Sequence, residues 1–359
     1  MANFSNFRKY FFIHGNLYTY GWKNESTLCL WMMNKYDRLI SLNCDLSVQD
    51  TRDDKCPFII NPHIPCFIYA NFKVDNDRTL TFTSRDCGKH FFALEFKPKG
   101  LQCTLNNCKL KFDLSCADDF ITKNFPEKYI IQFGGTLHNR AVEKHQTCLS
   151  FDGGENYMIL NYEIKNAVIL NRRSIIFVTK NMSGKVWFSY NEGQNWYGKS
   201  SLLHNLIELI PIELPNHPIM AAVNFNSHEN YYIVSQFNFS NLIGVFKLMT
   251  ERTCQDEDFE IFYAYSRFGK CFQGQEISYL KKKRPAMCFD NRTEVVSIIK
   301  QCPCSITDFH WYCIFNYSKP HYQVKDGFCM LNPLSNFTEP RLKCRDDGVP
   351  LIEWNGYDS

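Results

Sequence analysis

Short runs of alternating apolar and polar residues fill the first two thirds of the chain. Clear examples are residues 9–22, 66–74, 78–84, 128–135, 157–164, 174–180 and 185–190, followed by 203–214, 217–225 and 230–239. A period of two, with β-branched and aromatic residues and turn residues between the runs, predicts short strands. No amphipathic helix stands out here. The pattern therefore predicts an all-β region from residue 1 to about 245.

Three stretches of this region share the form Ser-x-Asp-x-Gly-x-x-aromatic. Residues 84–91 and 150–157 fit at every position, and residues 189–196 fit with Asn in place of Asp. The defining residues are Ser84, Asp86, Gly88 and Phe91; Ser150, Asp152, Gly154 and Tyr157; and Ser189, Asn191, Gly193 and Trp196. The spacing of their starts lies in the range of propeller blades, one of them carrying an insertion.

The chemistry of this repeat is that of a β-hairpin turn. An Asp or Asn side chain accepts backbone N–H bonds within the turn, and the glycine adopts a positive φ that other residues avoid. The aromatic residue is expected to fill the space between adjacent blades. The pattern resembles the Asp box of sialidases, some glycoside hydrolases and sortilin-type receptors, where it is structural. Asp86 and Asp152 are therefore not catalytic candidates.

Composition indicates in which cellular compartment the protein folds and which class of partner it does not bind. The chain has 17 cysteines, which crowd toward its C-terminal end, and a net charge of +3. So many cysteines indicate disulfides formed in an oxidising lumen, and the small charge gives no support for nucleic-acid binding. Sequons with the form Asn-x-Ser/Thr agree with a lumen, and they lie at Asn3, Asn24, Asn181, Asn238, Asn291, Asn316 and Asn336. All but Asn3 are predicted glycosylation sites.

The sequence contains neither a signal-peptide core at its start nor an apolar run long enough to cross a membrane. We therefore expect a piece of a longer secretory-pathway protein, which reaches the membrane only through segments outside this chain. A complete cytosolic protein is the alternative.

The C-terminal cysteine pattern carries a family resemblance. It runs through Cys254, Asp258-Phe259-x-Ile261, Gly269-Lys270-Cys271, Cys288, Cys302-Pro303-Cys304, Asp308-Phe309, Cys313 and Tyr317. This order resembles the ten-cysteine module that follows the ten-bladed propeller of the sortilin family of vacuolar protein sorting receptors. The resemblance implies the last four or five blades in residues 1–245 and an incomplete cysteine module in residues 246–359. Eight of its ten cysteines are present.

The same resemblance implies a disulfide pairing. It gives Cys254–Cys288, Cys271–Cys302 and Cys313–Cys329 in the module, and Cys103–Cys108 in a short loop upstream. It leaves Cys304 and Cys344 without partners in this chain. It gives no partner for Cys29, Cys44, Cys56, Cys66, Cys87, Cys116 and Cys148, whose odd number requires one thiol outside these pairs.

Three other interpretations compete for parts of the chain. Cys302, Cys304, His310 and Cys313 could hold zinc, although this spacing is not a usual zinc motif. The run 281–284, Lys-Lys-Lys-Arg, is predicted to be a solvated basic loop rather than a nucleic-acid patch. A sialidase-like hydrolase would need a pair of carboxylates, and no carboxylate stands in a recognisable site.

The sequence thus predicts the luminal part of a sortilin-like receptor and no enzyme, with no catalytic residue, cofactor or metal site. By resemblance, the receptor binds peptide or protein cargo for transport between Golgi, endosomes, lysosomes and cell surface, as a single-pass membrane protein when full length. No ligand residue can be placed on this chain, and a dimer stays an open alternative. A secreted propeller that mediates protein association is the second hypothesis.

Overall fold

The computed structural model folds the chain into small antiparallel sheets of consecutive strands, which confirms the all-β prediction. It describes residues 9–14, 16–23, 26–33, 39–51, 54–75, 78–88, 90–94, 109–139, 142–160, 164–170, 175–180, 185–200, 206–214, 217–226, 229–238, 252–264, 269–272, 275–292, 294–302, 322–325, 328–334 and 336.

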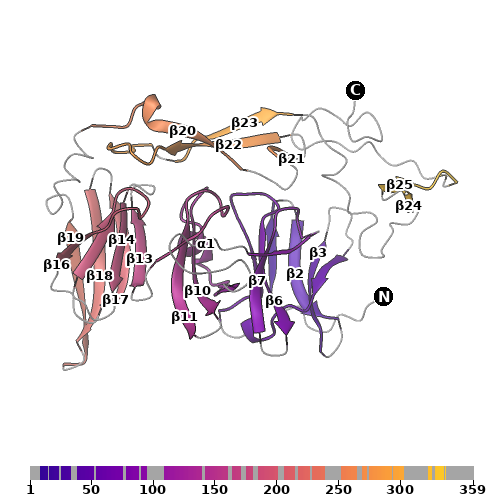
Figure 1. The fold of residues 1–359 in the computed structure, drawn as a ribbon, viewed down its shortest axis with the longest axis horizontal. Coiled ribbons are helices and arrows are strands. Elements are labelled where there is room, and N and C mark those ends of the chain that lie inside the picture. The colour runs from indigo at the N-terminus through magenta and orange to yellow at the C-terminus, as the bar shows by residue number, and fades with distance from the viewer. Residues whose placement is uncertain are drawn as a thin grey trace.

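Five sheets among the described residues follow one another as blades, which we number I to V (Figure 1). Blade I holds β1 (Tyr10–Ile13), β2 (Asn16–Trp22), β3 (Leu28–Met33) and β4 (Leu39–Cys44). Blade II holds β5 (Phe58–Ile60), β6 (Ile68–Asp75), β7 (Arg78–Ser84) and β8 (Phe92–Ala93). Blade III holds β9 (Lys109–Phe112), β10 (Ile131–Asn139), β11 (Val142–Ser150) and β12 (Met158–Ile159).

Blade IV holds β13 (Ile164–Leu170), β14 (Ile175–Lys180), β15 (Lys185–Ser189) and β16 (Tyr197–Ser200). Blade V shows β17 (Leu206–Leu214), β18 (His217–Asn226) and β19 (Tyr231–Asn238). A five-residue helix, α1 (Phe120–Asn124), and a 3-10 turn, η1 (Gln49–Thr51), lie between strands. The count of blades agrees with the four or five that the sequence predicts.

The first strand of blade II and the second strand of blade IV are buried on both faces. Every residue of β5 is buried, and so are Ile175, Ile176, Phe177 and Val178 of β14. Such strands read as continuous apolar runs because a neighbouring blade covers each face. One apolar cluster joins blades I, II and III, where the rings of Phe112 and Phe133 stack with centroids 4.7 Å apart. Another joins blades IV and V.

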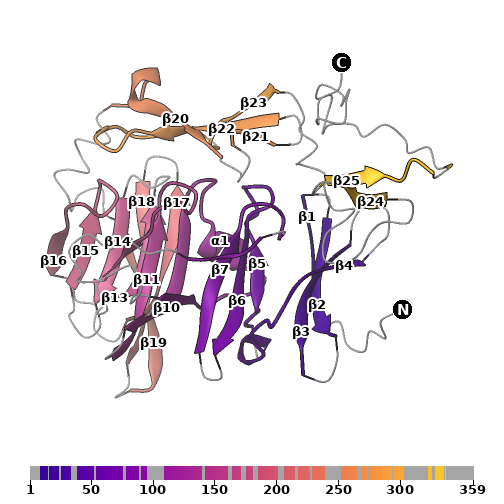
Figure 2. The same cartoon turned by 45° about the vertical axis from the view of Figure 1, so that its right-hand side comes forward.

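The cysteine-rich part forms a separate sheet. Its central strand is β22 (Gln275–Lys282), which pairs with β20 (Phe259–Tyr263), β21 (Cys271–Phe272) and β23 (Ser297–Gln301). The turn η2 (Asp256–Asp258) precedes β20, and β24 (Tyr322–Lys325) pairs with β25 (Phe328–Leu331). The β20–β23 sheet lies across one end of the blades in both views (Figures 1 and 2).

Three disulfides join cysteines that the sequence leaves unassigned. Cys29–Cys44 links facing residues of β3 and β4, Cys56–Cys116 links blades II and III, and Cys66–Cys87 ties the β5–β6 loop to the first Ser-x-Asp turn. Cys148 is buried and free, the one such cysteine among the described residues. It is the odd thiol that the sequence requires, and burial raises its pKa to about 12.

Candidate functional site: the box turns and the sheet that covers them

The three box turns occupy the same place in blades II, III and IV. Ser84, Ser150 and Ser189 are the last residues of β7, β11 and β15, the third strand of each blade. Each turn then leads into the fourth strand. The repeat of the sequence is therefore a repeat of architecture, in which each box closes the outermost hairpin of a blade.

Within each turn the box residues bond one another. In blade III, Ser150 Oγ donates to Asp152 Oδ1 at 2.8 Å, and Oδ1 also accepts the Asn156 N–H at 2.9 Å. Gly154 N–H donates to Ser150 Oγ at 2.8 Å. The boxes of blades II and IV repeat these bonds with their own residues. The carboxylates of Asp86 and Asp152 are thus engaged in holding turns.

The seventh box position contributes a bond that the sequence analysis missed. His90 Nδ1 lies 2.8 Å from Asp86 Oδ2, and Asn156 Nδ2 donates to Asp152 Oδ2 over the same distance. Burial acts to raise the pKa of Asp86, but bonds from His90 and Ser84 outweigh it and hold that pKa below its usual value. The sequence could have predicted this bond, because position seven holds a polar donor in all three copies: His90, Asn156 and Asn195.

Two consecutive residues of each box adopt a positive φ. The glycines Gly88, Gly154 and Gly193 have φ of 87°, 83° and 77°. The residue before each, at the fourth box position, is also left-handed: Cys87 at 58°, Gly153 at 64° and Glu192 at 56°. The sequence analysis assigned this conformation to the glycine alone.

The box glycines also allow each blade to approach the preceding one. A β-carbon on Gly88 would lie 2.7 Å from Leu42 of blade I, and one on Gly193 would lie 2.5 Å from Met158 of blade III. The aromatic positions vary more. Tyr157 reaches blade II, where its hydroxyl lies 2.7 Å from that of Tyr69, whereas Phe91 packs on Phe72 of its own blade. The expectation of an interblade aromatic holds for Tyr157.

The cysteine-rich sheet contacts the same ends of blades II, III and IV. Tyr279 OH of β22 donates to the carbonyl of His63 at 2.8 Å, and Lys281 Nζ donates to that of Phe151 at 2.7 Å. In the opposite direction, Lys128 Nζ of blade III donates to Val295 O at 2.9 Å. Tyr279 and Val295 also belong to an apolar cluster with strands of blades III and IV.

The first two residues of the basic run are part of this contact, so the prediction of a solvated basic loop was wrong for them, whereas Lys283 and Arg284 follow the strand and are exposed. Lys281 and Lys282 lie in β22 and are 8% and 3% exposed. Lys282 Nζ donates to Cys288 O at 3.3 Å, and Arg284 Nε donates to Glu192 Oε2 at 2.5 Å. Lys281 and Lys282 can be buried because carbonyl oxygens accept their hydrogen bonds and Glu192 lies near Lys281. A run of consecutive basic residues does not reveal these partners.

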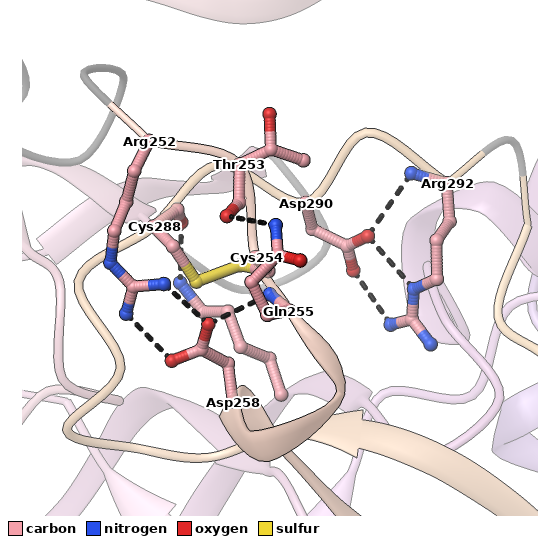
Figure 3. The surroundings of a disulfide bond; sticks show 9 residues. Arg252, Thr253, Cys254, Gln255, Asp258, Cys288, Asp290 and Arg292 are labelled. Carbon is pink, nitrogen blue, oxygen red and sulfur yellow. Dashed lines mark hydrogen bonds and ion pairs between the residues drawn. A yellow bond between two sulfur atoms is a disulfide. The ribbon is translucent and has the colours of Figure 1, made fainter.

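Paired charges surround the Cys254–Cys288 disulfide (Figure 3). On one side, Arg252 donates two bonds to Asp258, at 2.6 and 2.7 Å. These bonds, helped by the Gln255 N–H and opposed by burial, lower the pKa of Asp258 to about 2. On the other side Arg292 binds Asp290 and covers the ring of Phe259 at 4.0 Å. The Asp-Phe pair of the sequence motif thus supplies an anion and a stacking surface.

The structure contains two of the pairs that the resemblance implies, Cys254–Cys288 and Cys271–Cys302. Because Cys302 is oxidised, it is unavailable to the zinc set considered above. Among the described residues, Cys254, Asp258 and Cys288 lie close enough to share a metal, but the sulfurs are bonded to each other and Arg252 occupies the carboxylate. These residues do not fit a metal site.

Several predicted residues lie outside the described residues, so their predictions stand untested. They are the side chains of Cys103, Cys108, Cys304, Cys313, Cys329 and Cys344, and those of Asn24, Asn181, Asn238 and Asn316. The domain boundary at residue 245 falls there too, between the end of β19 and Arg252. Asn291 and Asn336 are exposed, as a glycan requires.

Comparison with known proteins gives a family match for the C-terminal part of the chain, which contains the bridged sheet. The family model described as sortilin, neurotensin receptor 3, C-terminal matches residues 219–357. The C-terminal part of the chain is therefore similar to the C-terminal part of sortilin. The match begins in β18 and continues through the cysteine-rich sheet, so the matched segment also includes β19 of blade V.

Curated relatives carry receptor and sorting names. The VPS10 domain-containing receptor SorCS3 of Mus musculus is 22% identical over 268 residues, which are 70% of this chain and 21% of that protein. The vacuolar protein sorting/targeting protein 10 of Pyricularia oryzae is 29% identical over 146 residues, 38% of this chain and 9% of that protein. The chain therefore spans about a fifth or less of the relatives' lengths.

Solved structures show weaker likenesses. A glycoside hydrolase of family GH74 from Niastella koreensis has a TM-score of 0.30 and 12% identity, over 63% of this chain and 35% of that one. A nidogen/laminin complex structure has a TM-score of 0.24 and 10% identity, over 62% and 75%. At these scores neither likeness bears on function. No helix in the described part of the chain has the length and apolar character needed to span a membrane.

Proposed function

We propose that this chain is the luminal part of a sorting receptor that binds peptide or protein cargo and carries it between Golgi, endosomes and lysosomes. The observation that carries the proposal is the coincidence of the sortilin match with the bridged sheet. The matched residues 219–357 contain both Cys254–Cys288 and Cys271–Cys302, and that sheet rests on blades closed by box turns.

The described contacts support a binding scaffold rather than an enzyme. Asp86 and Asp152 hold turns, and Glu192 is paired with Arg284. None of these carboxylates is available as a general acid or nucleophile, although sialidase-like hydrolysis remains the alternative to be tested. Disulfides across blades and module support an oxidising lumen, where cargo would be met.

A glycan and localisation experiment tests the compartment. The natural full-length protein is expressed with a tag, and its mobility is compared before and after removal of N-glycans, alongside the Asn291→Gln variant. We expect loss of one glycan in the variant and co-localisation with Golgi and endosomal markers. An unglycosylated protein in the cytosol would overturn the proposal, and quantitative release into the medium would favour the secreted propeller.

A sorting experiment tests the activity. Cells lacking the gene for this chain are assayed for lysosomal hydrolases in the medium, and the full-length protein is then restored. We expect missorted hydrolases to appear in the medium and to return to the cells on restoration. Unchanged sorting, together with turnover of a fluorogenic sialoside by the purified protein, would replace the receptor with the hydrolase.

A further inference from the structure

The fourth box position is the part of the turn that differs most between the blades. Its residues are Cys87 in blade II, Gly153 in blade III and Glu192 in blade IV, and all three are left-handed. A residue with a β-carbon is disfavoured in this conformation. A side chain kept there calls for a compensating contact, and Cys87 has one in its disulfide to Cys66.

In blade IV the compensating contact comes from the cysteine-rich sheet. The side chain of Glu192 is buried, 4% exposed, and a buried carboxylate is costly unless it is paired. Arg284 Nε binds its Oε2 at 2.5 Å, and Lys281 Nζ lies 3.8 Å from its Oε1. Lys281 also donates to the carbonyl of Phe151 in blade III, so one ammonium group joins two box turns.

In blade III the fourth box position, Gly153, contacts the cysteine-rich sheet through close packing. A β-carbon on Gly153 would lie 3.0 Å from Cζ of Phe262 in β20 and 3.0 Å from Ile64 of blade II. The ring of Phe262 therefore lies so close that a side chain at residue 153 would have to push it aside. On its other side, the Gly153 carbonyl accepts a bond from Arg85 of the blade II box at 3.2 Å.

We propose that the fourth box position is the docking position through which the propeller holds and orients its cysteine-rich sheet. Glu192 is the ionic docking residue, paired with Arg284 and Lys281, and Gly153 is the steric one, paired with Phe262. The partner of this surface is the β20–β23 sheet of the same chain. This inference concerns the assembly of the two parts and holds whatever cargo the protein binds.

The ionic contact is tested by amide hydrogen exchange on the full chain, secreted from eukaryotic cells so that its disulfides form. The variants are Glu192→Gln, Arg284→Gln and their combination, with Glu155→Gln as a control that removes an exposed carboxylate from a neighbouring box. We expect each single variant to raise exchange in β20 and β22 by about tenfold, while β14 and β15 of blade IV change less than about twofold. The combination should exceed neither single variant by more than about twofold.

Two outcomes would overturn the ionic part. Faster exchange in β14 and β15 together with β22 would make Glu192 a support of its own blade. Effects that multiply in the double variant would show that Glu192 and Arg284 act independently.

The steric contact is tested with Gly153→Ala and the companion change Phe262→Leu. Gly153→Ala should loosen β20 and β22, and the smaller side chain at residue 262 should restore at least part of the lost protection. If Phe262→Leu only adds to the loss, backbone strain at Gly153 explains the effect, and the docking assignment fails at blade III. Because exchange is read strand by strand, a variant that unfolds globally would also count against local docking.

Discussion

The blades and the cysteine-rich sheet are both built from antiparallel strands, but they differ in what covers those strands. In blade II every residue of β5 is buried between neighbouring blades. In the cysteine-rich sheet, Ile261 of β20 and Ile299 of β23 are 51% and 58% exposed. Inner blade strands such as β5 are held mainly by apolar burial, whereas the cysteine-rich sheet has exposed apolar residues on two of its strands and depends more on covalent links.

Disulfides accordingly do different work in the two regions. Cys29–Cys44 joins residues that already face each other in paired strands, within a buried blade. Cys254–Cys288 instead joins the segment before β20 to the loop after β22, flanked by two Arg–Asp pairs rather than by a core (Figure 3). A bridge contributes most to local order where few other contacts define the conformation.

Removing each bridge by paired serine substitutions should give the largest effects. On the chain-entropy relation, losing Cys254–Cys288, with its separation of 34 residues, costs about 4 kcal/mol, and losing Cys29–Cys44, with 15, costs about 3 kcal/mol. The sharper difference should be local: β20 and β22 lose exchange protection in the first variant, whereas β2 and β3 keep theirs in the second. Equal loss of protection in both regions would break the comparison.

Box turns should rank next, because their bonds are made inside a blade. Asp152→Ala removes the acceptor for Ser150 Oγ and for the Asn156 N–H and side chain, and should lower the free energy of unfolding by about 2 kcal/mol. The reverse change, Asn191→Asp, completes the third box and should raise it by less than about 1 kcal/mol. Denaturant unfolding measures both. A neutral Asp152→Ala would remove the box from the forces that hold the blades.

The Arg252–Asp258 pair gives the cysteine-rich sheet an acid-resistant contact. Since the pKa of Asp258 is lowered to about 2, its contribution is full above its ordinary value near 4 and is lost as pH falls toward 2. Exchange protection of β20 should therefore stay constant from pH 7 to 5 as far as this pair is concerned. Asp258→Asn should remove the loss seen below pH 4. A loss that persists in that variant would have another source.

The smallest effect should come from His63, at the contact between the two regions. Burial lowers the pKa of His63 below 6.5, with nearby Lys128 adding to the effect and a bond to Phe125 O opposing it. Neutral His63 is thus favoured in the folded protein. Its contribution is present above pH 6.5 and is lost as pH falls through the lowered pKa. His63→Gln should flatten the free energy of unfolding between pH 7 and 5, and an unchanged slope would exclude His63 as its source.

Much of this protein was readable because its signals are local. A box turn is built by residues at most four apart in sequence, such as Asp152 and Asn156, so its letters specify its bonds. Two module bridges could be inferred because the cysteine order resembles a family pattern. The bridges Cys29–Cys44, Cys56–Cys116 and Cys66–Cys87 could not, because each depends on which strands and loops become neighbours.

The basic run shows the same limit from the other side. Its four basic residues predict a solvated loop. Lys281 instead donates a hydrogen bond to Phe151 O, and Arg284 donates one to Glu192, partners 130 and 92 residues away in the chain. The sequence by itself determined strands, turn chemistry and the presence of disulfides, since these follow from short-range geometry and composition. Only the tertiary structure decided that the cysteine-rich sheet contacts Gly153 and Glu192, the fourth box positions of blades III and IV. That contact arises from the packing of three blades, whose relative placement no local pattern encodes.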